Sequence, residues 1–242
     1  KASLVNQQQS HATLVARLSK EIDNQQTRIA NLQEDEKRLT QLIARIQRQI
    51  AERRREEARK RAEARKQAQI AARREAERRA AEARKAGKPV PKAEPVKEAP
   101  VVDDVADDSA AGRAFGSLRG RMKLPASGTI SGQFGARRSE GTSWRGVFIK
   151  APEGQPVRAV ADGRVVYADT LRGFGNMLII DHGGGYMTIY GNGNQLAKSV
   201  GATVRAGDVV ASTGNSGNME DSGIYFELRH LGQPLNPSKW AR

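Results

Sequence analysis

The residues that could hold a metal ion or act as nucleophiles are few in this sequence. It contains no cysteine and only three histidines, His11, His182 and His230. A hydrolytic zinc site needs three deprotonated protein ligands and an open fourth position. His11 stands far from the other two along the chain, and no carboxylate is spaced to complete a ligand set with them. We therefore expect surface or turn histidines, with no metal and no other cofactor.

The aromatic residues that could form a core are all in the second half of the chain. Every Phe, Tyr and Trp lies at or after Phe115. A segment without aromatics and with little branched apolar bulk cannot bury enough surface to offset its ordering entropy. The fold class predicted is α plus all-β, with an elongated helical region at residues 1–86, a connecting region at 87–121 and one compact domain at 122–242.

A regular apolar pattern runs through the first fifty residues. Apolar side chains recur in alternating steps of three and four, interrupted at Gln25 and Glu36, which is typical of a coiled coil. Such a seam needs a partner helix, either a second copy of the chain or a segment upstream of Lys1, and we favour the upstream segment. The residues of the seam are Val15, Leu18, Ile22, Ile29, Leu32, Leu39, Ile43, Ile46 and Ile50.

Residues 51–85 carry half of the chain's net charge of +14. They consist mostly of Ala, Arg and Glu, which are strong helix formers and pair at spacings of three or four. We interpret this stretch as a long, solvated helix, with binding to an anionic surface such as membrane lipid as the alternative. Nucleic-acid binding is not favoured, because no aromatic side chain is interleaved with the charges. No apolar stretch is long enough to span a membrane.

The connecting region combines a Pro-rich linker with a short amphipathic segment. The linker at residues 87–100 should be extended. Residues 103–118 could form a helix that carries Val105, Phe115 and Leu118 on one apolar stripe. Such a helix either docks on the neighbouring domain or acts as a regulatory plug.

The compact half alternates short β-branched runs with Gly, Pro, Asn and Asp. This pattern, between residues 122 and 242, predicts an all-β sandwich or open barrel. The runs LPASGTISGQFGARRS, WRGVFIKAPEGQPVRAVADGRVVYA, GFGNMLIIDHGGGYMTIYGN, VRAGDVVASTGNSG and YFELRHLGQPLNPSKW resemble the LytM-type domain, the fold of the M23 peptidoglycan metallopeptidases. Together with the coiled coil, the chain resembles the EnvC-type murein hydrolase activators of Gram-negative cell division.

The resemblance places the family's catalytic positions on residues that cannot do zinc chemistry. Active members bind zinc through a His and an Asp four residues apart and through the second His of an H-x-H pair. Those positions fall at Trp144, Phe148 and Tyr225, and the two remaining catalytic histidines fall at Gly223 and Asn192. Indole, phenyl and phenol groups do not form a hydrolytic zinc site at neutral pH. The resemblance therefore implies that the domain is not an enzyme.

The same alignment predicts that the former active site has become a hydrophobic cleft. Several aromatic side chains that converge on one cleft indicate a recognition site. The alternative is that these positions, Trp144 and Phe148 above all, have drifted into local packing. The residues expected to line the cleft are Arg145, Phe148, Phe174, Met177, Tyr190, Tyr225 and Arg229.

In the family that the chain resembles, this cleft binds a helix of a periplasmic N-acetylmuramoyl-L-alanine amidase and thereby switches the amidase on. The coiled coil of such activators is bound by the periplasmic domain of FtsX, in the FtsEX complex. The resemblance also implies a periplasmic location, with a signal peptide removed, and self-inhibition of the cleft by residues 101–119, including Val105, Phe115 and Leu118. A passive peptidoglycan-binding protein is the alternative function, and direct binding to peptidoglycan is left open.

Overall fold

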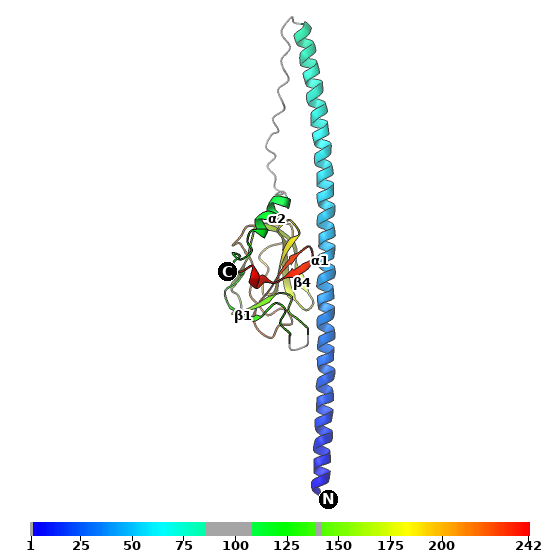
Figure 1. Cartoon of the computed structure of the whole chain (residues 1–242), viewed down its shortest axis with the longest axis vertical. Coiled ribbons are helices and arrows are strands. Elements are labelled where there is room, and N and C mark those ends of the chain that lie inside the picture. Colours follow the sequence, from blue (N-terminus) through cyan, green and yellow to red (C-terminus); the bar gives the residue numbers. More distant parts are fainter. Residues whose placement is uncertain (1, 86–107, 139–141) are drawn as a thin grey trace. The chain divides into compact units, whose positions relative to one another are not determined.

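The computed structural model describes residues 2–85, 108–138 and 142–242, and Figure 1 shows the order of their elements along the chain. The predicted linker at 87–100 and the residue Val105 lie outside these ranges. Two compact units are distinguished, one made of Lys1–Ala44 with Ala106–Arg242 and the other of Arg45–Val105. We describe each unit by itself.

The N-terminal region forms one helix, α1 (Ala2–Lys85), as the sequence predicts. In the second unit its surface carries ion pairs between residues four apart, including Glu56 with Lys60 at 2.8 Å and Arg73 with Glu77 at 3.1 Å. These pairs are exposed, so each adds only a few tenths of a kcal/mol, about the value of an i,i+4 pair on a helix surface. This part of α1 is therefore stabilised by helix propensity and by many weak ion pairs. No described helix is long and apolar enough to cross a membrane.

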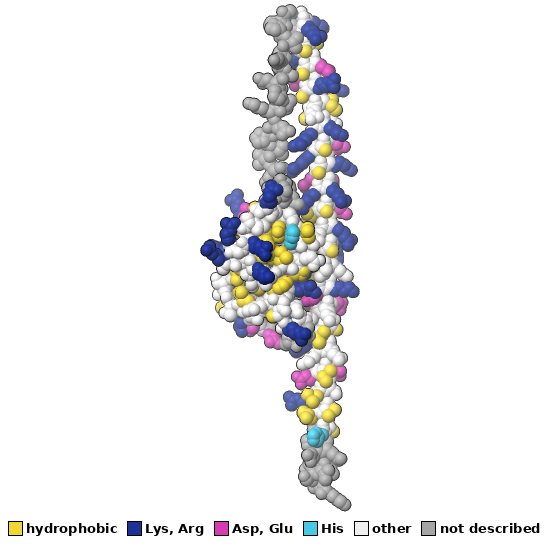
Figure 2. Space-filling view, viewed as in Figure 1, with side chains coloured by type: hydrophobic (Ala, Val, Ile, Leu, Met, Phe, Trp, Pro, Cys, Tyr) yellow, Lys and Arg dark blue, Asp and Glu magenta, His cyan; other side chains and the backbone are white. Residues whose placement is uncertain are grey.

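The apolar seam of α1 has two different environments within the first unit. Its early members, including Val15, Leu18 and Ile22, are about half exposed or more. Figure 2 shows hydrophobic side chains on the surface of this part of the helix. By contrast, Leu39 and Ile43 are only 2% and 1% exposed. The later part of the seam is therefore packed, while the early part presents an apolar stripe to solvent.

The C-terminal domain is an antiparallel β-sheet domain, in agreement with the predicted fold class. Within the described residues its main sheet has the strand order β1-β2-β9-β6-β5-β4-β7, with β10 on β9, and a second sheet pairs β3 with β8. The strands of the main sheet are β1 (Thr129–Gly132), β2 (Val147–Lys150), β4 (Gly163–Leu171), β5 (Gly175–Asp181), β6 (Tyr186–Gly193), β7 (Thr203–Val204), β9 (Gly223–His230) and β10 (Gln233–Leu235). The remaining elements are β3 (Pro156–Arg158), β8 (Val209–Ser212), the short helix α2 (Asp108–Gly116) and a final 3₁₀ turn η1 (Pro237–Lys239).

Strand register separates the two faces of the main sheet. Across the central strands Leu178 pairs with Tyr190, and Tyr190 pairs with Phe226, and all three belong to the hydrophobic core. Because side chains alternate along a strand, their neighbours point to the opposite face. On that second face Ile189 pairs with Ile179 and with Glu227. All three are fully buried, so the second face of the sheet is covered as well.

Helix α2 joins the core of the domain through Phe115. The Phe115 ring stacks on His182 with centroids 4.6 Å apart and on Tyr186 at 4.9 Å, and it is 2% exposed. Gly112 allows this docking, because a Cβ there would lie 2.5 Å from the backbone of Gly184. Burial lowers the pKa of His182 to about 4, so this ring is neutral at physiological pH. Sequence analysis left two interpretations of this segment, docking on the neighbouring domain or a regulatory plug. Phe115 is docked in the core of that domain.

A Phe115→Ala variant should therefore lose stability. Removing a buried phenyl ring takes away its transfer free energy and leaves a cavity, at a typical cost of about 3–5 kcal/mol. Urea unfolding followed by tryptophan fluorescence measures the change, with the exposed Leu231→Ala as the matched control. A loss below about 1 kcal/mol for Phe115→Ala would contradict the assignment of Phe115 to the core.

Candidate functional site

Three aromatic side chains meet where β2 and β9 lie side by side. Phe148 on β2 is the register partner of Tyr225 on β9. Trp144, which precedes β2, lies 6.2 Å by ring centroid from both of them, and Phe174 lies 5.7 Å from Tyr225. The structure thus brings together four of the residues singled out from the sequence. We call Trp144, Phe148, Phe174 and Tyr225 the aromatic cluster.

The indole of Trp144 is held between a glycine and an arginine. A Cβ on Gly132 of β1 would lie 2.7 Å from the Trp144 ring, so the ring lies flat on the β1 backbone. On the ring's face stands the guanidinium of Arg138, with its central carbon 4.1 Å from the ring centroid. Such a cation–π contact is worth about 0.5–2 kcal/mol. Trp144 is therefore positioned by its neighbours although it remains partly exposed.

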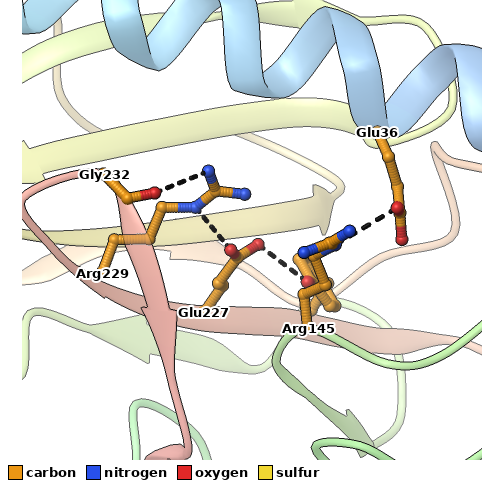
Figure 3. Close-up of polar contacts among 6 residues, drawn as sticks. Glu36, Arg145, Glu227, Arg229 and Gly232 are labelled. Carbon is orange, nitrogen blue, oxygen red and sulfur yellow. Dashed lines mark hydrogen bonds and ion pairs between the residues drawn. The ribbon is translucent and has the colours of Figure 1, made fainter.

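A buried charge pair lies beside the aromatic cluster on β9. The Arg229 Nε donates to Glu227 Oε1 at 2.5 Å, and the Tyr225 hydroxyl donates to Glu227 Oε2 at 2.8 Å. Arg229 also donates to the carbonyl of Gly232 at 3.2 Å (Figure 3). Burial raises the pKa of Glu227, and Arg229 and the Tyr225 hydroxyl act against that rise. The pKa of the Tyr225 phenol is raised well above 10 by burial and by the Glu227 charge, so it remains a proton donor.

The positions aligned with the family's two other histidines have structural roles here. Asn192 adopts a positive φ of 67°, which asparagine tolerates better than most residues. Its amide donates to the carbonyl of Gly214 at 2.8 Å and accepts from the backbone N–H of Gly217 at 2.9 Å. At Gly223 a Cβ would collide with the carbonyl oxygen of Ile149, so no larger residue fits that backbone. Both positions fix the strands and loops around the site.

Tyr190 is a correction to the predicted cleft. The sequence prediction puts Tyr190 beside Tyr225, but the structure places it on the core face of the sheet. Its hydroxyl accepts from the backbone N–H of Val160 at 3.2 Å, and its ring lies 5.4 Å from Phe226. The cause is the alternation of side chains, because Tyr225 pairs with Gly191 and not with Tyr190. Met177 lies on the second face of the sheet with Ile179 and is fully buried, as Phe148 and Tyr225 nearly are at 3% and 4% exposure.

The segment predicted to cover the site lies elsewhere within the described residues. Phe115 packs against His182, Tyr186 and Trp240, and Leu118 packs on the same core. Within the described part of the chain, neither residue lines the cavity beside Trp144, Phe174 and Tyr225. The physical reason is that the apolar stripe of this segment is used to close the domain's own core.

A segment of α1 that sequence analysis did not connect with the site contacts it instead. Leu39 lines a cavity of about 20 Å³ together with Trp144, Phe174 and Tyr225. That volume is close to the space of one water molecule, so the packing is tight. Glu36 accepts a hydrogen bond from the Nε of Arg145 at 3.2 Å, a contact drawn in Figure 3. The sequence signal for this contact is Glu36 itself, one of the two polar exceptions within the apolar seam.

A second anchor lies on the turn between β4 and β5. Asn31 accepts a hydrogen bond from Arg172 at 3.2 Å, and the Arg172 Nε lies 3.7 Å from Asp35. Gly173 faces Asp35 so closely that a Cβ on this glycine would collide with the carboxylate. Its φ of +86° also favours glycine. The site is thus a helix-binding surface made by β2, β9 and the β4–β5 turn, and residues 31–43 of α1 lie on it.

The chemistry of the site follows from the side chains that the described residues place there. No group of three or more His, Cys, Asp or Glu side chains that could hold a metal ion occurs among them. On the domain's side of the site the carboxylate is Glu227, which is committed to Arg229 and Tyr225, and its neighbours are aromatic rings and the cations Arg138, Arg145 and Arg172. What the arrangement can do is bind an apolar helix whose flank carries an acidic residue.

Comparison with known proteins identifies a family model and named relatives that match part of the chain. Residues 142–237 match the profile of peptidase family M23. They lie within the C-terminal β domain, which we call the M23-type domain after this match. The murein hydrolase activator EnvC of Escherichia coli (strain K12) is 40% identical over 126 residues, which are 52% of this chain and 30% of that protein. The murein hydrolase activator NlpD of Salmonella typhimurium is 36% identical over 119 residues, 49% of this chain and 30% of that protein.

Among solved structures, the M23-type domain resembles the catalytic domain of the prophage-encoded M23 protein EnpA from Enterococcus faecalis. The two share 27% identity with a TM-score of 0.44, over 48% of this chain and 95% of that one. The chain spans less than a third of the length of the EnvC and NlpD relatives. The likeness to these activators therefore concerns the M23-type domain.

Proposed function

We propose that this chain is a non-catalytic activator of periplasmic N-acetylmuramoyl-L-alanine amidases, acting in septal peptidoglycan splitting during cell division. The observation that carries the proposal is the aromatic cluster beside the buried Glu227–Arg229 pair. The family resemblance aligns three members of the cluster, Trp144, Phe148 and Tyr225, with the zinc ligands of active members. Support also comes from the named activator relatives of the M23-type domain. We further propose that the M23-type domain has no hydrolytic activity of its own.

Activation would proceed by helix exchange at the aromatic cluster. An amidase helix would lie on the surface that residues 31–43 of α1 now occupy, and its removal from the amidase would open the amidase's own active site. Both helices cannot occupy one surface, so α1 acts as an intramolecular competitor. We propose self-inhibition by α1 in place of self-inhibition by residues 101–119, because Phe115 of that segment packs in the domain core.

Release of α1 would depend on a partner of the coiled coil. The early seam of α1 is exposed at Val15, Leu18 and Ile22, which offers an apolar stripe for a further helix. We propose that the periplasmic domain of FtsX, in the FtsEX complex, acts on this part of the molecule and shifts α1 away from the site. The equilibrium between the covered and the open site would then depend on the state of the FtsEX complex.

The test is an activation assay with the full chain. Purified amidase is incubated with dye-labelled sacculi, with and without the chain, and the released dye is measured, while zinc in the purified chain is determined by metal analysis. We expect amidase-dependent release to rise with the chain, no release by the chain alone, and no stoichiometric zinc. Co-sedimentation of the chain with sacculi without any stimulation would instead favour passive peptidoglycan binding.

A further inference from the structure

The stripe that α1 presents to the domain contains one residue that does not suit its place. Leu39 and Ile43 are fully buried, and one helical turn before Leu39 stands Asp35. Residues four apart share one face of a helix, so Asp35 occupies the position where the stripe calls for an apolar side chain. Asp35 is only 3% exposed. The carboxylate is therefore buried in the middle of the contact.

The groups around Asp35 give its charged carboxylate little stabilisation. Neither of its carboxylate oxygens has a hydrogen-bond partner in the structure. The cations nearby are Arg172, half exposed with its Nε at 3.7 Å, and Arg38 on α1, which is paired with Glu34 at 2.6 Å. Burial raises the pKa of Asp35, the charge of Glu34 acts in the same direction, and Arg172 and Arg38 oppose it. A buried charge without hydrogen bonds weakens the contact that buries it.

The charge of Glu36, the next residue, is paired and therefore favours the contact. It is partly exposed and pairs with Arg145 at the rim of the site, so its charge is retained at low desolvation cost. The two neighbouring acids therefore differ in what they contribute. Glu36 matches the surface, and Asp35 is a mismatch.

We propose that residues 31–43 of α1 are an imperfect copy of the helix that the site is built to bind, and that Asp35 keeps this copy displaceable. The partner helix then has the apolar pair of Leu39 and Ile43, an acidic residue opposite Arg145, and an uncharged residue in place of Asp35. This inference rests on the proposed function, because it specifies the helix class that the activator captures.

The mismatch at Asp35 also explains how a free partner helix can displace the tethered α1. A tethered helix acts at an effective concentration of about millimolar, far above that of a free partner. A free helix at micromolar concentration must bind the same surface about a thousandfold better to displace it. An uncharged residue in place of a buried, unsatisfied carboxylate supplies a large part of that factor. Without Asp35, α1 would hold the site against such a partner.

The test compares synthetic peptides of residues 29–46 carrying a fluorophore at the N-terminus. One has the natural sequence, one carries Asp35→Asn, and one carries Glu34→Gln as a control with the same change in net charge at an exposed position. Peptides of this length are marginal helices, so binding is compared at equal helix content by circular dichroism. The receptor is the full chain carrying Leu39→Asp in its own α1, and binding is followed by fluorescence anisotropy.

We expect the Asp35→Asn peptide to bind at least tenfold more tightly than the natural peptide at pH 7, and the Glu34→Gln peptide to bind like the natural one. Because burial raises the pKa of Asp35, the bound state takes up a proton as pH falls. The affinity of the natural peptide should therefore move towards that of the Asp35→Asn peptide as pH is lowered from 7. Equal affinities of the natural and Asp35→Asn peptides at pH 7, or no binding by any peptide, would overturn the inference.

A second readout separates this inference from the proposed function. In the full chain Asp35→Asn should reduce amidase stimulation at least tenfold, because α1 then holds the site, whereas Glu34→Gln should leave stimulation unchanged. If the peptides differ as expected but the chain stimulates no amidase, the proposed function fails and the assignment of the helix class stands. If the chain stimulates an amidase but Asp35→Asn leaves both peptide affinity and stimulation unchanged, the inference fails and the function stands.

Discussion

A Leu39→Asp variant of the full chain is expected to stimulate an amidase at least tenfold more strongly than the natural chain. Leu39 is 2% exposed and lines the cavity with Trp144, Phe174 and Tyr225. A carboxylate at this position would be buried without a partner, at a cost of several kcal/mol, so α1 would leave the surface. Release of dye from labelled sacculi by a fixed amount of amidase measures the effect.

The matched control is Leu18→Asp, on the same seam of α1 but about half exposed. It introduces the same charge and should leave stimulation by the isolated pair of proteins unchanged. Urea unfolding of the M23-type domain should be the same in both variants, because Leu39 is not part of the domain core. Stimulation by Leu39→Asp that equals the natural level, with a folded domain, would contradict the role of α1 as competitor.

An Arg229→Met variant is expected to lose about 3–5 kcal/mol of unfolding free energy, the usual cost of removing one partner of a buried ion pair. Glu227 is fully buried and would retain only the Tyr225 hydroxyl as a partner. The double variant Arg229→Met, Glu227→Leu should recover most of the loss, because no buried charge remains. Urea unfolding measures the three proteins.

The matched control for this series is Arg172→Met, whose cation is about half exposed and 3.7 Å from its carboxylate. It should change the stability of the domain by less than about 1 kcal/mol. A loss of similar size in Arg229→Met and Arg172→Met would show that the Glu227–Arg229 pair is not a buried pair of this strength. The amidase assay on the stable double variant then reports whether the charge pair itself is needed for recognition.

The strand pattern and the family resemblance together predicted much of the site. Trp144, Phe148, Phe174 and Tyr225 were singled out from ordered motifs, and in the structure the centroid of each ring lies 5.7 or 6.2 Å from that of another member. Tyr190 was misplaced because a tyrosine one residue from the right position points to the opposite face of the sheet. Motif alignment marks a strand, and only register decides which face a side chain lies on.

The role of α1 could not be predicted from the sequence for a different physical reason. A heptad pattern shows that one face of a helix is apolar, but the same face fits a second helix or the surface of a sheet. Leu39 uses it against the M23-type domain, and Ile43 is buried as well, whereas Leu18 and Ile22 leave it exposed. The burial of Asp35 could not be predicted from the sequence either, because a charged residue beside an apolar seam is usually solvated. The polar exception at Glu36 was the one local signal of the contact.

The most direct test of the central claim holds α1 on the domain by a reversible covalent link. The chain has no cysteine, so Asn31→Cys with Arg172→Cys, a pair in contact across the site's edge, gives two unique thiols. A short reducible bismaleimide joins them, and amidase stimulation is measured before and after the linker is reduced. The account predicts that stimulation is lost in the linked chain and returns on reduction. Full stimulation by the linked chain would contradict the claim that α1 and the amidase compete for one surface.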